Sequence, residues 1–195
     1  ALVPVGGKPL IEHVARKLKA AGIEEAVVNV HHFADKVEDW IGDQNIMKMK
    51  VSDERRMLLE TGGAVLHARR YLEGCGHFLI HNVDIMSNAD LKWFEAQVRE
   101  GALATLLVSN RPTKRFLLFE PGTMRLVGWH NTDTGDYSLA DKSLKVDDCL
   151  AYGFSGIHIM SDKVFALMDE YVDERGLTVD PDAGVRFPIM SFYLW

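Results

Sequence analysis

The chain has 195 residues, of which 47% are hydrophobic and 26% charged, a composition typical of a globular protein with one core. Its net charge of −6 argues against a surface that binds nucleic acid, because such surfaces concentrate lysine and arginine. No apolar run approaches the length of about 18 residues that would span a membrane. Two cysteines, Cys75 and Cys149, are too few for a disulfide framework and favour a reducing cytoplasm.

The two ends of the chain suggest truncation. The first residues, from Ala1 to Lys8, include no initiator methionine and do not resemble a secretory signal. The last residue, Trp195, lies inside an apolar run that begins at Phe187. We therefore expect one domain over residues 1–195 that lacks a segment at each end.

The first half of the chain alternates between helical and strand patterns. In order, the patterns predict a helix at 10–21, a strand at 25–30, a helix at 34–41 stopped by Gly42, a strand at 47–51, a helix from about 60 to 71, a strand at 77–84 and a helix at 90–100. Such alternation predicts an α/β fold with a mixed, mostly parallel sheet covered on both faces. The strand ends, with Asn29, Ser52 and Asp84, should then share one rim.

The second half follows a different pattern. A strand at 102–108 precedes two strands at 115–120 and 125–129, which the Pro121-Gly122 turn joins as an antiparallel hairpin. The polar, acidic stretch 131–148 is predicted to be a mobile loop. A strand at 152–159 follows, and then a helix that Ser161 or Asp162 can cap. This part should form a small antiparallel subregion beside the main sheet.

Asp84 is the first candidate for a functional residue. It follows the apolar run that starts at His77, and ligands of open α/β sheets collect beyond the carboxyl ends of strands. A carboxylate there suits Mg²⁺ that also carries phosphates and water. A simple cap on the turn or on the next helix is the alternative.

The paired glycines Gly62 and Gly63 are the second candidate. Glycine lets the backbone approach a ligand closely, and amides at a helix start favour anionic groups. A purely structural role is the alternative, because glycine serves any turn with positive φ. If the ligand role holds, Gly62→Val should weaken binding of that ligand and leave the fold intact.

Three stretches together carry a resemblance to a known family. They are Leu2-Val3-Pro4-Val5-Gly6-Gly7-Lys8-Pro9-Leu10-Ile11, Glu60-Thr61-Gly62-Gly63 and Asn82-Val83-Asp84. In this order they resemble the sugar-phosphate nucleotidyltransferases, also called nucleotide-sugar pyrophosphorylases. Ser52-Asp53-Glu54 and Phe154-Ser155-Gly156-Ile157 fit the same family. The chain is most similar to the branch of N-acetylmuramate-1-phosphate uridylyltransferases and mannose-1-phosphate guanylyltransferase-like proteins.

The resemblance implies a Rossmann-like, three-layer nucleotidyltransferase fold of the GT-A-like type and an Mg²⁺-dependent reaction. A nucleoside monophosphate passes from an NTP to a sugar-1-phosphate, and pyrophosphate leaves. It implies that Asp84 holds the metal and that Lys8 approaches the phosphates, although Lys8 also fits a solvated turn. The implied nucleotide-binding residues are Glu60, Thr61, Gly62, Gly63 and Asn82, and the implied sugar-binding residues are Glu120, Ser155 and Gly156.

The chain departs from the family pattern at three points. The family's G-x-G-T-R loop and its P-K-x-L lysine would precede Ala1, and its second metal-binding aspartate would follow Trp195. Val83 replaces the glycine that usually separates the asparagine from the aspartate, which restricts the backbone beside the nucleotide. These departures leave open a catalytically inactive nucleotide-binding or regulatory module. A cytidylyltransferase acting on a nonsugar phosphate is a further alternative, and the expected oligomeric state is a monomer or a homodimer.

Overall fold

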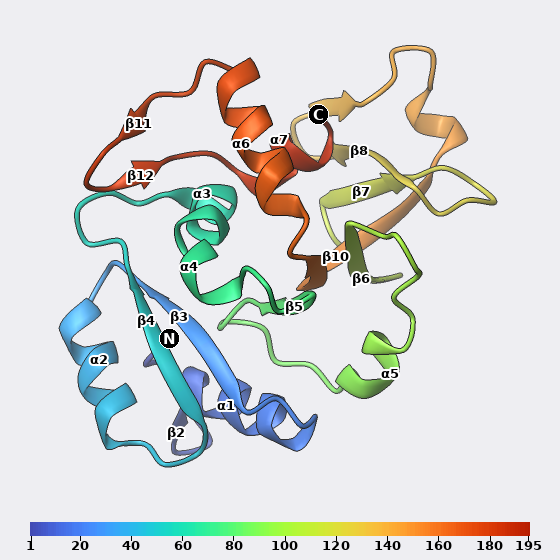
Figure 1. Cartoon of the computed structure of the whole chain (residues 1–195). Helices are drawn as coiled ribbons and strands as arrows, with labels where there is room; N and C mark the ends of the chain where they lie inside the picture. Colours follow the sequence, from blue (N-terminus) through green and yellow to red (C-terminus); the bar gives the residue numbers. More distant parts are fainter.

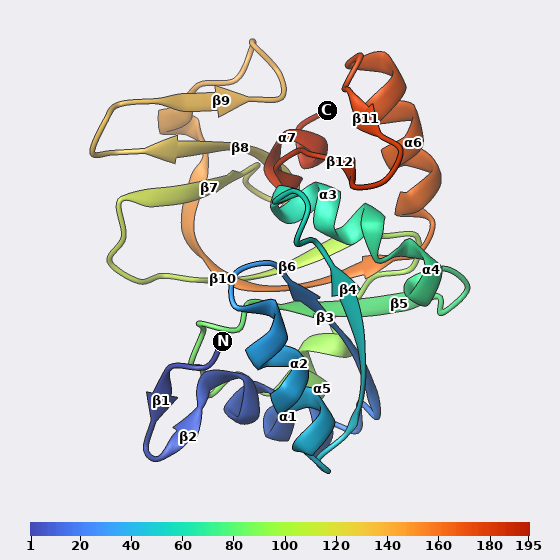
Figure 2. The ribbon, with the colours of Figure 1, turned by 90° about the vertical axis from the view of Figure 1, so that its left-hand side faces the viewer.

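The computed structural model describes all residues from Ala1 to Trp195 and has helices on both faces of its strands (Figures 1 and 2). The helices, including one short 3₁₀ helix, η1, are α1 (Leu10–Ala20), α2 (Ala34–Asp43), α3 (Glu60–His67), α4 (Arg69–Leu72), α5 (Leu91–Glu95), η1 (Val146–Asp148), α6 (Val164–Glu174) and α7 (Ile189–Tyr193). None of them is long and apolar enough to cross a membrane.

The strands form one large sheet and three small ones. The large sheet contains β5 (His77–His81), β6 (Ala104–Ser109), β7 (Arg115–Phe119), β8 (Leu126–Asn131), β9 (Tyr137–Leu139) and β10 (Leu150–Ser161). The small sheets are the parallel pair β3 (Glu25–Val30) and β4 (Lys48–Asp53), the hairpin of β1 (Pro4–Val5) and β2 (Lys8–Pro9), and the pair β11 (Val179–Asp180) and β12 (Gly184–Val185).

The α/β class and the mixed sheet predicted from the sequence are confirmed, but the balance of strand directions differs from the prediction. β3 and β4 are the only parallel pair, and every other pairing is antiparallel. The reason is β10, a twelve-residue strand that curves from β7 to β5 and runs antiparallel to β5, β6 and β7 (Figure 2). The predicted hairpin at the Pro121-Gly122 turn is present as β7 and β8.

Several local predictions were wrong in extent. The strand predicted at 77–84 ends at His81, and the helix predicted at 60–71 is divided into α3 and α4. Helix α2 continues through Gly42 to Asp43, because one glycine in a helix costs only about 1 kcal/mol. Helix α5 ends at Glu95 rather than Glu100. The stretch 131–148 is not one unstructured loop, because β9 pairs with β8 within it and η1 follows. The polar composition of this stretch did not reveal the short edge strand β9, in which only Tyr137 is exposed.

Three groups of apolar side chains hold the layers together. The largest joins α3, α6 and α7 to one face of the large sheet, with Phe165, Met160 and Met168 fully buried. A second group, around Phe94 and Ile157, joins α5 and α1 to the opposite face, and a third packs α1 and α2 against β3. The strands therefore lie between two layers of helices, as the predicted three-layer fold requires (Figure 2).

His158 is a buried titratable group in the largest of these interfaces. Its Nδ1 lies 2.6 Å from the hydroxyl oxygen of Tyr193, and 5% of the residue is exposed. Burial lowers the pKa of His158 to about 4 and raises the pKa of Tyr193. The folded protein therefore keeps His158 neutral, with the Tyr193 hydroxyl donating to its ring.

The depressed pKa predicts a loss of stability in mild acid. An unfolded histidine takes up a proton near pH 6.5, whereas the folded one resists protonation down to about pH 4. The free energy of unfolding should therefore fall as the pH drops through this window, by roughly 2 kcal/mol from this group between pH 7 and pH 5. Urea denaturation at the two pH values measures this change in the free energy of unfolding. His158→Gln should remove that part of the pH dependence, and His31→Gln at an exposed position should keep it.

Candidate active site

The carboxyl ends of β3, β4 and β5 meet at one rim, as predicted. Asn29 lies beside Ser52 in the parallel register of β3 and β4. Val30, at the end of β3, and Val83, just after β5, pack into the same apolar group. The chain leaves β5 directly from this rim, so Asn82 and Asp84 lie at the position where α/β folds bind ligands.

Asp84 is exposed, and its carboxylate makes no hydrogen bond or ion pair with the rest of the chain. The capping alternative is therefore wrong, because Asp90 caps α5 by accepting hydrogen bonds from the amides of Lys92 and Trp93. A carboxylate that the fold leaves unpaired at a strand end is available to a cation or a ligand.

Asn82 and Gly156 are in contact next to Asp84. The amide of Asn82 donates to the carbonyl of Gly156 at 2.9 Å. Gly156 has φ +69°, and a Cβ there would lie 3.0 Å from Asn82 Nδ2, so the position requires glycine. The pairing of β10 with β6 shifts register between Phe154 and His158, which places Ser155 and Gly156 in an irregular stretch. Such bulges are frequent beside active sites.

The fit of a divalent metal can be tested on these residues. Mg²⁺ is usually held by one or two carboxylates together with substrate phosphates and water. Asp84 supplies one such carboxylate. No three histidine, cysteine, aspartate or glutamate side chains lie close enough together to hold a metal ion by themselves. The residues present therefore fit a metal that arrives with phosphates, held in part by Asp84.

The Glu60-Thr61-Gly62-Gly63 motif is bound to a segment near the end of the chain, Val185–Ile189, which we call the terminal segment. The amides of Gly62 and Gly63 both donate to the carbonyl of Phe187, at 2.9 and 3.1 Å. Thr61 Oγ1 accepts from the amide of Ile189 at 2.9 Å. Glu60, in the left-handed region at φ 61°, pairs with Arg186 at 2.7 Å. The backbone amides of Gly62 and Gly63 thus already donate their hydrogen bonds to the terminal segment.

This packing explains why the motif contains two glycines. A Cβ on Gly62 would lie 2.4 Å from the ring of Phe187, and a Cβ on Gly63 would lie 2.0 Å from the carbonyl oxygen of Val185. The structural alternative for the pair is therefore supported, and the expectation that Gly62→Val leaves the fold intact is wrong. Nucleotide binding by the motif stays a prediction.

The sequence placed Asn29 at the rim and Glu54 in the Ser52-Asp53-Glu54 motif, but it did not predict the contact that joins their side chains. Glu54 is buried, with Oε1 accepting from Asn29 Nδ2 at 2.7 Å and Oε2 accepting from the amide of Leu59 at 3.3 Å. This carboxylate links β3 to the start of α3. The motif alone does not predict this link, because the partners of Glu54 lie on other elements.

Two predicted residues lie outside the cluster of Asn82, Asp84 and Gly156. Lys8 is half exposed in the β1–β2 hairpin and lies 3.5 Å from Glu12. Glu120 accepts a hydrogen bond from Thr123 within the β7–β8 turn. It follows Phe119, which pairs with Leu150, six residues before Gly156 on an extended strand, so the separation is about 20 Å. The structure therefore does not bring Glu120 to Gly156.

Two cations that the sequence analysis missed lie close to the cluster. Arg111 donates from Nη2 to the carbonyl of Phe154, next to Ser155, at 3.1 Å. Lys17 on α1 donates to both the carbonyl and the hydroxyl of Ser87, at 2.8 and 2.7 Å, and so fixes the loop that follows Asp84. Neither residue belongs to a recognisable motif, because each reaches the site from a distant part of the sequence.

Comparison with solved structures supports the fold. HddC from Yersinia pseudotuberculosis superposes with a TM-score of 0.68 at 19% identity, over 97% of this chain and 72% of that protein. A protein from Bacillus anthracis described as a putative glucose-1-phosphate thymidylyltransferase gives the same TM-score and identity, over 99% of this chain and 73% of that one. The chain thus has a Rossmann-like layered fold, which it shares with both solved proteins.

Sequence comparison gives the family. Residues 1–146 match the MobA-like NTP transferase domain. N-acetylmuramate alpha-1-phosphate uridylyltransferase from Caulobacter vibrioides is 35% identical over 85% of this chain and 68% of its own length. Its counterpart from Neisseria meningitidis is 31% identical over 84% of this chain and 67% of its own length. The chain belongs to the MobA-like NTP transferase family, and the predicted resemblance to sugar-phosphate nucleotidyltransferases is confirmed.

Proposed function

We propose that this protein transfers a nucleoside monophosphate from an NTP to a sugar-1-phosphate, and that the rim with Asn82, Asp84 and Gly156 is where the phosphates react. The observation that carries the proposal is the unpaired carboxylate of Asp84 in the turn just after β5. Family membership supplies the reaction class. UTP is the first nucleotide to test, because both relatives are named as uridylyltransferases.

In the proposed reaction an oxygen of the sugar-1-phosphate attacks the α-phosphorus of the NTP, and pyrophosphate leaves. This displacement needs the two substrates held in line and their charge neutralised, and it needs no covalent bond to the protein. Asp84 would hold a divalent metal, with Mg²⁺ as the proposed ion, and such a metal neutralises charge on the phosphates.

The remaining roles follow from position. Asn82 would contact the ribose or support the metal region, and Ser155 and Gly156 would contact the sugar beside it. Arg111 would add a positive charge near Ser155 for the sugar phosphate, which is a role that phosphate groups favour for arginine. We retain the Glu60–Gly63 motif as a nucleobase contact through its exposed side, since its amides are already bonded.

The experiment that tests the proposal is a pyrophosphate-release assay on the native-length protein with Mg²⁺. Each of the four NTPs is combined with N-acetylmuramate-1-phosphate, glucose-1-phosphate, mannose-1-phosphate and phosphocholine. Release that requires one NTP together with one sugar-1-phosphate supports the proposal. Release with phosphocholine alone would identify a nonsugar cytidylyltransferase, and nucleotide binding without release would identify an inactive module.

We further propose a cytoplasmic location and a monomeric or homodimeric state. Both cysteines are free thiols, which suits a reducing compartment, and NTP substrates are available there. Sedimentation of the native-length protein over a hundredfold range of concentration would distinguish a monomer from a dimer.

A further inference from the structure

The loop that carries Asp84 has few hydrogen bonds in its middle. It comprises residues 82–90, between β5 and α5, and we call it the Asp84 loop. Its residues 86–89 form no helix or strand. Their only hydrogen bonds are the two that Ser87 accepts from Lys17 on α1, at 2.8 Å to the carbonyl and 2.7 Å to the hydroxyl. A single side chain from another element therefore holds the middle of this loop.

A cavity of about 300 Å³ lies between the Asp84 loop and α1. Every residue from 85 to 89 lines its loop side, and His13, Val14 and Lys17 line its α1 side. Because no side chains fill this space, the middle of the loop does not rest on a closely packed layer. The side chain of Lys17 reaches from α1 to Ser87 beside the cavity, and it is the polar connection between the two sides.

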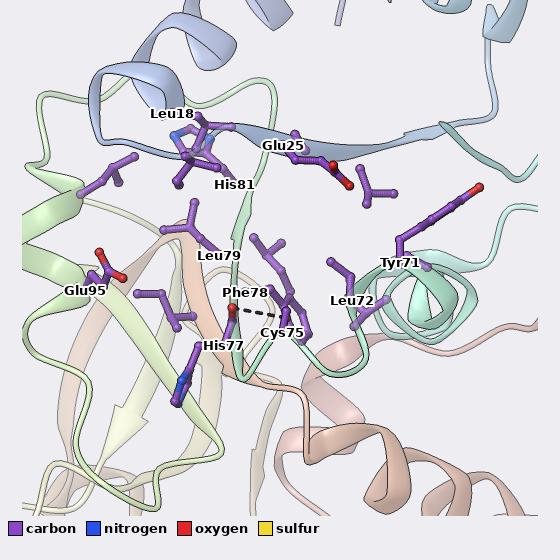
Figure 3. A pocket seen from close by; sticks show the side chains of 18 of the residues that line it. Leu18, Glu25, Tyr71, Leu72, Cys75, His77, Phe78, Leu79, His81 and Glu95 are labelled. Carbon is purple, nitrogen blue, oxygen red and sulfur yellow. Dashed lines mark hydrogen bonds between the residues drawn. The ribbon is translucent and has the colours of Figure 1, made fainter. Parts of the chain in front are cut away.

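The helix that carries Lys17 has a fixed position relative to β5. Leu18, the next residue of α1, and Leu79 of β5 pack against the same apolar group around Phe94 and Ile157. Leu18 and Leu79 also lie, together with His81, at the larger cavity between α1 and β5 (Figure 3). Lys17 thus extends from a well-packed helix to a loop segment that has no such support.

The direction of the Asp84 side chain depends on the backbone on either side of it, because its carboxylate has no partner in the fold. On the amino side, the hydrogen bond from the amide of Asn82 to the carbonyl of Gly156 fixes the backbone. On the carboxyl side, the contact between Lys17 and Ser87 lies three residues beyond Asp84. Movement of Ser87 would therefore change the position of Asp84.

We propose that Lys17 is a positioning residue for the reaction: by binding Ser87, it keeps the Asp84 loop in the conformation in which Asp84 can hold a metal beside the phosphates. This inference rests on the proposed function of Asp84. It adds a residue that touches neither the metal nor the substrates and acts only through the loop.

Loss of the Lys17 contact should change how often the loop adopts its binding conformation. When a binding-competent conformation is only partly populated, the apparent affinity falls by the populated fraction, and saturating ligand restores full occupancy. A hydrogen bond from a charged donor can shift such an equilibrium by about tenfold. A protein without this contact should therefore require more Mg²⁺ and still reach normal turnover when Mg²⁺ is saturating.

Amide hydrogen exchange of the native-length protein, without metal or nucleotide, tests the effect on the loop directly. Lys17→Met keeps a long side chain and removes its hydrogen-bond donors. The amide of Ile85, which donates to the carbonyl of Asn82, should exchange about tenfold faster in this variant. The amide of Asn82, which donates to Gly156, should exchange at an unchanged rate. Equal exchange at Ile85 in the two proteins would overturn the proposal.

The Mg²⁺ dependence of pyrophosphate release is the second measurement. Lys17→Met should raise the Mg²⁺ concentration for half-maximal activity by about tenfold and leave turnover at saturating Mg²⁺ within about twofold. Lys17→Arg retains donors for Ser87 and should restore most of the Mg²⁺ affinity. Lys19→Met is the matched control, because Lys19 is exposed on the same helix and makes no side-chain hydrogen bond or ion pair.

A double-mutant cycle separates the contact with Ser87 from a general effect of charge. Ser87→Ala removes the hydroxyl and leaves the carbonyl, so its effect should be smaller than that of Lys17→Met. The double variant should need no more Mg²⁺ than Lys17→Met alone. Additive effects would overturn the proposal, as would an equal effect of Lys19→Met. If Lys17→Met fails to fold, Ser87→Ala at its exposed position gives both measurements.

The proposal for Lys17 and the proposed function fail in different ways. Full Mg²⁺-dependent activity of Asp84→Asn would refute the metal-binding role of Asp84, whatever the Lys17 variants do. Loss of activity in Asp84→Asn, together with an unchanged Mg²⁺ dependence in Lys17→Met, would refute the positioning role of Lys17 alone. A loss of turnover in Lys17→Met that saturating Mg²⁺ does not restore would also refute it.

Discussion

Asp84→Asn in the native-length protein should lower turnover by about 100- to 1000-fold, the usual loss when one group that stabilises transition-state charge is removed. The change keeps the size of the side chain but removes the charge that would hold a divalent metal beside the phosphates. Because the carboxylate has no partner in the fold, the thermal stability should stay unchanged. The pyrophosphate-release assay and a thermal melt measure the two effects.

Asp43→Asn is the matched control for this variant. Asp43 ends α2, is exposed and forms no ion pair, so its loss of charge should change neither turnover nor stability. Full Mg²⁺-dependent activity of Asp84→Asn would refute the metal-binding role of Asp84. An equal loss of activity in both variants would show that overall charge, rather than the rim, is responsible.

Gly63→Ala should destabilise the fold by about 3 kcal/mol or more, at the upper end of the cost of overpacking. The new Cβ would lie 2.0 Å from the carbonyl oxygen of Val185, and backbone cannot rotate away as a flexible side chain can. Relief would require the terminal segment to move, which would break the hydrogen bonds of Gly62 and Gly63 to Phe187. Equilibrium denaturation in urea measures the loss.

Gly42→Ala is a control that should change the stability in the opposite direction. Gly42 lies within α2, and a Cβ added there would meet nothing within 4 Å, so alanine should stabilise the protein by about 0.5–1 kcal/mol. A Gly63→Ala protein as stable as the unmutated one would show that the terminal segment does not hold the motif in solution.

Local patterns predicted much of this fold. The strand at 25–30 matches β3, and the helix from Leu10 ends one residue before its predicted end, because helical spacing and the following Gly22 are both local signals. The direction of β10 was not predictable in this way. Its pairing with β5, β6 and β7 depends on contacts between residues far apart in the sequence, which no local period encodes.

The candidate site was predictable to a similar degree. The position of Asp84 at a strand end followed from the apolar run before it, and the contact between Asn82 and Gly156 followed only from the tertiary fold. For the Glu60–Gly63 motif, the two glycines indicated that another group approaches the backbone closely. It did not reveal that the approaching group is the backbone of Phe187, because that partner belongs to the same chain rather than to a ligand.

The bond between the motif and the terminal segment has a consequence for the time course of folding. Glu60 and Arg186 are 126 positions apart, so this contact closes a very long loop, and loop closure of that kind slows folding. During synthesis the ribosome must first produce Phe187 before Gly62 and Gly63 can find its carbonyl. The Glu60–Gly63 motif should therefore be among the last parts of the molecule to reach its final conformation.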